Sequence, residues 1–184
     1  HCEVPIDYII RCVEELQKRE ADCVGGQIMT CGETWIGRGI SLAQASFFGV
    51  GGVAFRAGRK SSGYVDTLAF GAYRKSVFNR LGTFDVDLVR NQDDEFNFRL
   101  LQAGGRIWMD NTIHVKYHAR SNFIKLWKQY SQYGLYKVLV MKKRGALPSM
   151  RSLVPGTFVL SLIISLAVAI WGGTIKPILA TAGT

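Results

Sequence analysis

An uncharged run of 19 residues, Leu153–Trp171, constrains the fold of this chain more than any other feature. A helix of about 20 apolar residues crosses a hydrocarbon layer roughly 30 Å thick, so the run predicts a transmembrane helix. The basic residues that precede the run are Lys142, Lys143, Arg144 and Arg151. Such an excess predicts that the N-terminal side of the span faces the cytoplasm. We expect residues 151–184 to form one or more truncated transmembrane segments; a buried core helix is the alternative.

Charge is distributed unevenly along the chain. All 14 acidic residues lie in residues 1–110, whereas residues 111–184 contain 10 Lys and Arg and no acid. An acid-free basic half beside an apolar run favours binding to anionic lipid or to a diphosphate. No nucleic-acid-binding motif accompanies the charge, so we expect no nucleic-acid partner.

The segment before the apolar run, residues 122–144, alternates basic, aromatic and aliphatic side chains. Trp127, Tyr130 and Tyr133 lie among lysines and leucines, as in helices whose Trp and Tyr rings lie at the depth of lipid headgroups. We therefore expect residues 122–150 to be an amphipathic interfacial helix region. A plain amphipathic helix packed on the core is the alternative.

Residues 1–121 predict an α/β domain in which helices and strands alternate. The expected helices cover residues 5–20, 37–49, 71–81 and the segment that starts at Gln92, and the expected strands cover residues 21–27, 106–110 and 113–117. The glycine-rich segment 49–53 could offer backbone N–H groups to a phosphate, or could be an ordinary loop. The four cysteines have neither C-x-x-C nor zinc-site spacing, so we expect reduced thiols.

Three consecutive carboxylates, Asp93, Asp94 and Glu95, open a short amphipathic helix. Asp93 lies at or just before the N-terminus, where unpaired backbone N–H groups and the helix dipole favour an ionised carboxylate that can accept a proton. Glu95 and Arg99 have the spacing of a pair across one turn. Ordinary capping of the first turn is the alternative explanation of the acidic cluster.

Several segments in order resemble the acceptor-side core of the family-2 glycosyltransferases. They are Gly82–Asp85, Gln92–Asp93, Arg99–Leu100 and Ala103–Ile107. In that family a Glu-Asp motif supplies the catalytic base; here Asp93 stands in the position of the base and Gln92 replaces Glu. The loss of that charge should leave the base less perturbed. The resemblance implies that residues 1–121 are the acceptor-side part of a partial GT-A-like, Rossmann-like catalytic domain.

The resemblance also implies further site residues. His1 matches the last member of the Asp-x-His variant of the metal motif, which implies a divalent cation, Mn²⁺ or Mg²⁺. Gly71 and Ala72 would leave room for a sugar and Arg74 could anchor that region. Arg120, Gln129 and Tyr130 are implied near the donor diphosphate. Asp94 and Glu95 would support the base, and Gln132 stands where membrane-bound members usually have Arg.

The implied function is an inverting hexosyltransferase. It would move a sugar from a nucleotide-sugar donor to a polysaccharide or lipid-linked acceptor at the cytoplasmic face of the inner (plasma) membrane, in exopolysaccharide biosynthesis. Because the chain opens on His1 within a motif, we expect a C-terminal fragment that is inactive alone. Two other hypotheses remain: a membrane-anchored binding or scaffold module whose acidic cluster is only a cap, and a metal-dependent phosphohydrolase that uses the acidic triplet.

Overall fold

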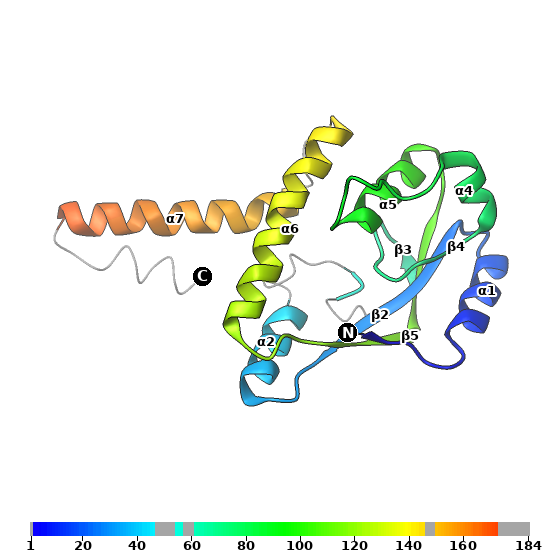
Figure 1. The fold of residues 1–184 in the computed structure, drawn as a ribbon, viewed down its shortest axis with the longest axis horizontal. Coiled ribbons are helices and arrows are strands. Elements are labelled where there is room, and N and C mark those ends of the chain that lie inside the picture. The colour runs from blue at the N-terminus through cyan, green and yellow to red at the C-terminus, as the bar shows by residue number, and fades with distance from the viewer. Residues whose placement is uncertain (1, 47–53, 57–60, 146–149, 173–184) are drawn as a thin grey trace. The chain divides into compact units, whose positions relative to one another are not determined.

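The computed structural model describes residues 2–46, 54–56, 61–145 and 150–172, and it divides into two compact units, residues 1–146 and 147–184 (Figure 1). The elements of the first unit are, in order, β1 (Cys2–Glu3), α1 (Tyr8–Lys18), β2 (Cys23–Cys31), α2 (Trp35–Ala45), β3 (Gly63–Tyr64), β4 (Ala72–Tyr73), α4 (Lys75–Leu81), α5 (Gln92–Gln102), β5 (Ile107–His118) and α6 (Phe123–Arg144). The α/β expectation is confirmed for this unit.

The sheet is built on the parallel pair β2 and β5, in the order β1-β5-β2-β4, with β3 also paired to β5. Strand β5 covers 12 residues, so the prediction of two separate strands in this region was wrong. The register shifts between Gly26 and Gln27, so that Asp110 and His114 face successive residues of β2. This bulge lets one strand continue through Asn111 and Thr112, the two residues that separate the predicted strands.

Helices cover both faces of the sheet. Successive residues of a strand point to opposite faces, and Cys23 and Val24 accordingly belong to different cores. On one face α1 buries Tyr8, Cys12 and Leu16 against Val24, Ile113 and Val115. On the other face α4 and α5 bury Val77, Phe96 and Leu100 against Cys23, Ile107 and Met109. The expected core positions of the carboxylate helix, Phe96 and Leu100, are therefore confirmed.

Helix α2 begins and ends earlier than expected. The hydroxyl of Thr34 caps the helix by accepting a hydrogen bond from the backbone N–H of Gly37 at 3.0 Å, and the helix begins at Trp35, two residues before the predicted start. The helix ends at Ala45, and the glycine-rich segment 49–53 lies outside the described residues. The four cysteines are free thiols, as expected, with Cys12 and Cys23 buried.

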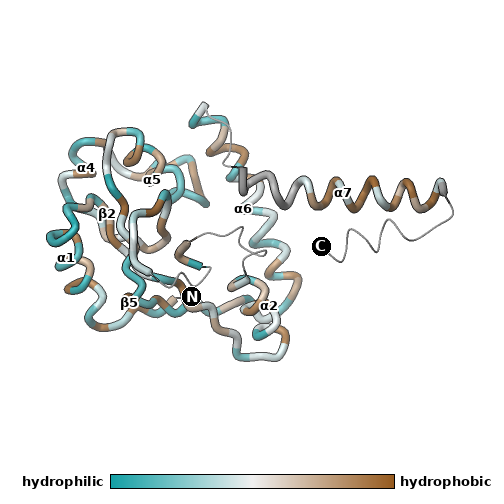
Figure 2. The backbone as a smooth tube through the Cα atoms, turned by 180° about the vertical axis from the view of Figure 1, so that it is seen from behind, coloured by the Kyte–Doolittle hydropathy of each residue, from teal (hydrophilic) through white to brown (hydrophobic). Residues whose placement is uncertain are grey.

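The second unit contains α7 (Met150–Gly172), a helix of 23 residues whose described part is mostly apolar (Figure 2). Its presence confirms the helix expected over Leu153–Trp171. Over the described residues, no helix is both long enough and apolar enough to cross a membrane. The membrane span predicted for residues 151–184 is therefore not confirmed.

Candidate active site

Asp93 lies in the first turn of α5 and is half-buried. Asn91, in a left-handed conformation with φ of 61°, precedes the helix, and its side chain does not cap it. One carboxylate oxygen of Asp93 accepts the backbone N–H of Asp94 at 2.9 Å. Burial raises the pKa of Asp93, and the charge of Asp94 adds to this effect. Desolvation thus outweighs the hydrogen bonds that favour the ionised form of Asp93, and the comparison with a base that follows Glu stays a prediction.

The two neighbouring carboxylates have cationic partners. Asp94 pairs with Lys137 at 2.6 Å and with Arg144 at 3.2 Å. Glu95 pairs with Arg99 at 2.7 Å, as its spacing predicts. Within the described part of the chain, no Lys or Arg forms an ion pair with Asp93. Its carboxylate is thus the member of the triplet that is left to accept a proton.

The first turn of α5 is held against α6 by hydrogen bonds and ion pairs. The Arg90 guanidinium donates to Gln132 Oε1 at 3.2 and 3.3 Å, and Asn91 Nδ2 donates to the carbonyl of Tyr133 at 3.2 Å. Together with the pairs of Asp94, these contacts join the first turn of α5 and the loop before it to residues of α6 that lie more than 40 positions later in the chain. Gln132, which departs from the resembled family, therefore has a defined partner in Arg90.

Arg120 and Gln129, both implied near the donor diphosphate, are brought together. Arg120 Nε donates to Gln129 Oε1 at 2.9 Å, and Gln129 Nε2 donates to the hydroxyls of Tyr117 at 2.8 Å and Tyr133 at 3.0 Å. Gln129 is only 5% exposed, so this network is internal. Sequence reasoning missed Tyr117 and Tyr133, although the spacing of four residues from Gln129 could have indicated Tyr133.

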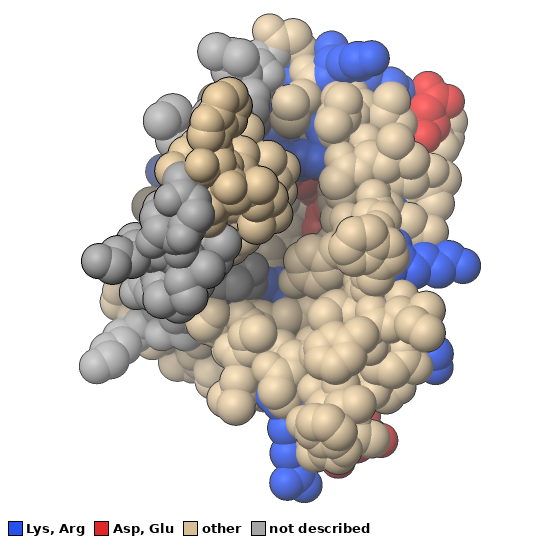
Figure 3. Space-filling model, turned by 90° about the vertical axis from the view of Figure 1, so that its left-hand side faces the viewer, with Lys and Arg blue, Asp and Glu red and all other residues tan. Residues whose placement is uncertain are grey.

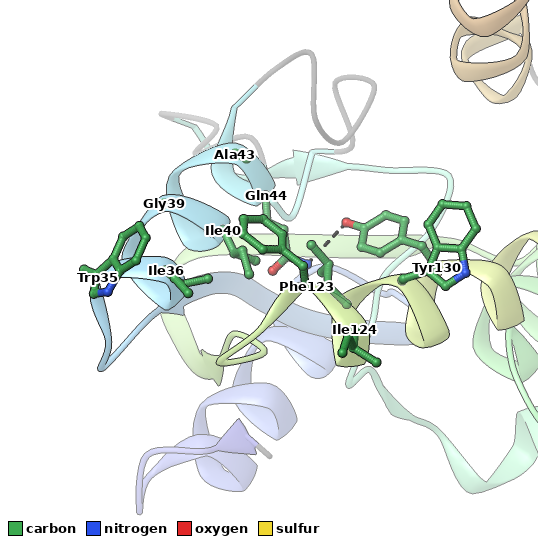
Figure 4. A pocket seen from close by; sticks show the side chains of 11 residues that line it. Trp35, Ile36, Gly39, Ile40, Ala43, Gln44, Phe123, Ile124 and Tyr130 are labelled. Carbon is green, nitrogen blue, oxygen red and sulfur yellow. Dashed lines mark hydrogen bonds between the residues drawn. The ribbon is translucent and has the colours of Figure 1, made fainter.

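Tyr130 does not join this network. Its hydroxyl accepts a hydrogen bond from Gln44 Nε2 at 3.3 Å, and the ring lines an apolar groove between α2 and α6 (Figure 4). The groove side and the network side are different sides of α6. The structure therefore separates Tyr130 from the two residues with which it was predicted to act.

A polar pocket of about 450 Å³ lies where the parallel strands β2 and β5 end. His118, the last residue of β5, donates from Nε2 to a carboxylate oxygen of Glu3 at 2.9 Å, and its Nδ1 lies 3.6 Å from a carboxylate oxygen of Glu33. Arg120 and Lys125 line the same pocket. The carboxyl ends of parallel strands are the usual position of ligand sites in open α/β sheets, and this pocket offers cations for an anionic ligand.

The metal prediction falls on a residue outside the described part of the chain, His1. Among the residues that the structure describes, no group of three or more His, Cys, Asp or Glu side chains is arranged to hold a metal ion. The described donors alone therefore do not make a cation site, and the predicted Mn²⁺ or Mg²⁺ stays a prediction.

Gly71 and Ala72 lie beside β2. A Cβ atom on Gly71 would lie 2.5 Å from the Cys23 sulfur, so close packing of the sheet gives a reason for glycine here. Ala72 pairs with Val24 in the sheet. Arg74 anchors this region, since its side chain donates to the carbonyls of Leu16 and Ala21. Next to Ala72, the pKa of Tyr73 is raised by burial and by nearby charges that include Asp93, so β4 lies near the candidate base.

Two known proteins align with the chain. The succinoglycan biosynthesis protein ExoA of Rhizobium meliloti (strain 1021) is 30% identical over 155 residues, which are 84% of this chain and 47% of that protein. A dolichyl N-acetyl-alpha-D-glucosaminyl phosphate 3-beta-D-2,3-diacetamido-2,3-dideoxy-beta-D-glucuronosyltransferase of Methanococcus voltae is 32% identical over 85 residues, 46% of this chain and 26% of that protein. No family model matches. The aligned part thus covers less than half of either relative. The chain is thus similar to part of a succinoglycan biosynthesis protein and to part of a glucuronosyltransferase.

Proposed function

We propose that the protein containing this chain transfers a sugar, with inversion, from a nucleotide-sugar donor to a glycan or lipid-linked acceptor at the cytoplasmic face of a membrane. The similarity to a glucuronosyltransferase and to a succinoglycan biosynthesis protein supports the reaction class. The observation that carries the proposal is the Asp93 carboxylate, half-buried and without an ion-pair partner in the described residues, beside two carboxylates that are both paired.

Asp93 acts as the general base in this proposal. It removes the proton of the acceptor hydroxyl while that oxygen attacks the anomeric carbon from the face opposite the leaving nucleotide diphosphate. A pKa raised by burial suits this task, because a base is most effective when its pKa approaches the working pH. Asp94 and Glu95, held by their cations, fix the turn that carries it.

The departing diphosphate is stabilised by cations in this proposal. Arg120 and Lys125, in the pocket at the carboxyl ends of β2 and β5, are candidates for that role. Gln129 positions Arg120 through its 2.9 Å hydrogen bond. A divalent cation near His1 would neutralise part of the same charge.

Membrane association is proposed through α6. The helix carries Trp127 and several lysines on exposed positions, and the acid-free charge of residues 111–184 favours an anionic lipid surface. The basic residues before Leu153 support a cytoplasmic position for this side of the chain.

The test of the catalytic proposal is Asp93→Asn in the full-length protein, with sugar transfer from radiolabelled donors measured in membranes. We expect turnover to fall by a factor of about 10² to 10⁴, the usual contribution of a general base. Asp87→Asn is the matched control, because Asp87 is an exposed carboxylate that pairs with Lys143. Near-normal turnover of Asp93→Asn, with folding intact, would remove Asp93 as the base.

A further inference from the structure

Helix α6 turns polar side chains towards the rest of the first unit and a row of apolar side chains away from it. Gln129, Lys137 and Arg144 contact Tyr117 and Asp94 of that unit. Ile124, Trp127 and Leu135 share the opposite side of the helix and are 83%, 77% and 63% exposed. An apolar helix face of this length that stays in water costs free energy, which indicates that something apolar covers it.

Helix α2 extends this apolar surface. Between α2 and α6 lies a groove of about 820 Å³, lined by Ile36, Ile40 and Ala43 from α2 and by Phe123 and Leu126 from α6 (Figure 4). Trp35 and Trp127, one from each helix, also line it and are 81% and 77% exposed. The hydrogen bond from Gln44 to Tyr130, two residues that also line the groove, joins the two helices.

The charges of the two helices indicate which kind of partner covers the groove. Helices α2 and α6 together contain seven Lys and Arg and no Asp or Glu. Lys137, Lys143 and Arg144 pair with carboxylates of the same unit. The others, Arg38, Lys125, Lys128 and Lys142, are exposed. Figure 3 shows Lys and Arg side chains at several places on one face.

This charge argues against a second copy of the chain as the partner. In a two-fold symmetric contact the same surface meets itself, so the exposed cations of one copy would face those of the other. A bilayer that contains anionic lipid offers hydrocarbon for the groove and negative headgroups for the lysines. Trp side chains are the ones enriched at the boundary between these two layers.

We infer that the groove between α2 and α6 receives hydrocarbon chains of an anionic phospholipid bilayer, so that α2 as well as α6 enters the membrane interface. This inference rests on the membrane association proposed above and adds to it a second contact element. Helix α2 was not predicted from the sequence to contact a membrane, and its 11 residues contain a single cation, Arg38.

Tryptophan fluorescence provides the test. The full chain is added to vesicles of phosphatidylcholine and phosphatidylglycerol whose acyl chains carry bromine, which quenches indoles that reach the hydrocarbon. Trp35→Phe, Trp127→Phe and Trp108→Phe are compared, since Trp108 is only 9% exposed and is the matched control. We expect Trp35→Phe and Trp127→Phe each to lose a similar share of the quenchable signal, and Trp108→Phe to lose none.

A second pair of variants tests binding rather than position. Leu42, on α2, is 73% exposed, and Ile9, on α1, is 65% exposed. Leu42→Asp should weaken sedimentation with the vesicles about tenfold, whereas Ile9→Asp should leave it unchanged. If both variants bind as the parent chain does, or if both weaken equally, α2 has no specific role and the inference fails.

The outcomes separate this inference from the proposal on which it rests. Quenching of Trp127 without quenching of Trp35 would overturn the role of α2 and leave the membrane association of α6 intact. No quenching of either residue, with no sedimentation, would overturn both. If the chain forms a dimer without lipid and Trp35 is shielded from solvent in that dimer, a second copy occupies the groove and the inference is overturned.

Discussion

Gln129 Oε1 accepts a hydrogen bond from Arg120 Nε at 2.9 Å, which joins the pocket at the end of β5 to the buried side of α6. The amide nitrogen of the same Gln129 reaches Tyr133, and the carbonyl of Tyr133 accepts from Asn91, two residues before Asp93. A continuous series of hydrogen bonds therefore connects the proposed diphosphate side of the site with the turn that carries the proposed base.

Replacing Gln129 should affect both stability and donor binding. Gln129→Leu leaves Arg120 and two tyrosine hydroxyls without their buried partner, which should lower the free energy of unfolding by about 1–3 kcal/mol. We also expect a higher KM for the nucleotide sugar, because Arg120 loses its positioning contact. Gln129→Glu, which keeps the acceptor for Arg120, should have a KM close to that of the parent protein. Equal KM values for both variants would show that Gln129 has only a structural role.

The pair of Asp94 and Lys137 should be measurable as a coupling. At 2.6 Å, with both side chains between a quarter and a third exposed, the pair is partly shielded from solvent. In a double-mutant cycle of Asp94→Asn and Lys137→Met, read by chemical unfolding, we expect a coupling of about 1 kcal/mol that weakens as salt is added. A coupling near zero would mean that Arg144 alone holds Asp94.

Asp93→Asn should stabilise the chain at neutral pH. The folded-state pKa of Asp93 is raised by burial, so its stabilising contribution is present below the ordinary carboxyl pKa and is lost as the pH rises through the folded-state value. Near pH 7 the ionised carboxylate is a net cost that Asn removes. Thermal unfolding should show a Tm a few degrees higher for the variant at pH 7, with the difference vanishing below about pH 4. A variant less stable at pH 7 would contradict the raised pKa.

The expected increase in stability of Asp93→Asn also makes the test of catalysis easier to interpret. If Asp93→Asn folds at least as well as the parent and yet transfers no sugar, unfolding cannot explain the loss. Active sites often keep groups that cost stability, because catalysis needs them in an environment that does not favour them.

The sequence predicted local features of the site better than its assembly. The pairing of Glu95 with Arg99 and the burial of Phe96 and Leu100 follow from spacing along one helix, and all are confirmed. The pairing of Asp94 with Lys137 joins residues 43 positions apart, and no local pattern indicates it. The raised pKa of Asp93 likewise depends on what packs around it, which spacing does not reveal.

The assignment of Tyr130 shows the same limit. Gln129 and Tyr130 are adjacent in sequence, so a motif treats them as one unit, but adjacent helical residues point about 100° apart. Gln129 faces the tyrosines of the interior and Tyr130 faces α2. A motif match therefore located the helix correctly, but it did not indicate that the two side chains have different partners.

Thiol reactivity should distinguish the four cysteines. Burial raises the pKa of Cys12, and it raises that of Cys23 to about 12, so neither forms the thiolate that reacts with alkylating agents. Cys2 is exposed. With iodoacetamide at pH 8, peptide mass spectrometry should find Cys2 modified first and Cys23 unmodified until the chain unfolds. Early modification of Cys23 would show that β2 opens readily.

The bulge between β2 and β5 should be intolerant of any side chain at Gly26. A Cβ atom there would lie 2.1 Å from the carbonyl oxygen of Ile113, which is backbone and cannot move without displacing the strand. We expect Gly26→Ala to lower the free energy of unfolding by at least about 3 kcal/mol, as disruptions of packed backbone do. Gly134→Ala is the control: Gly134 lies inside α6, where a Cβ has no neighbour within 4 Å, and alanine there should stabilise the helix by up to about 1 kcal/mol. Chemical unfolding of both variants gives the comparison. If Gly26→Ala is as stable as the parent, β2 and β5 do not approach as closely at the bulge as the structure shows. Two separate strands would then describe residues 107–118 better than the single 12-residue strand β5.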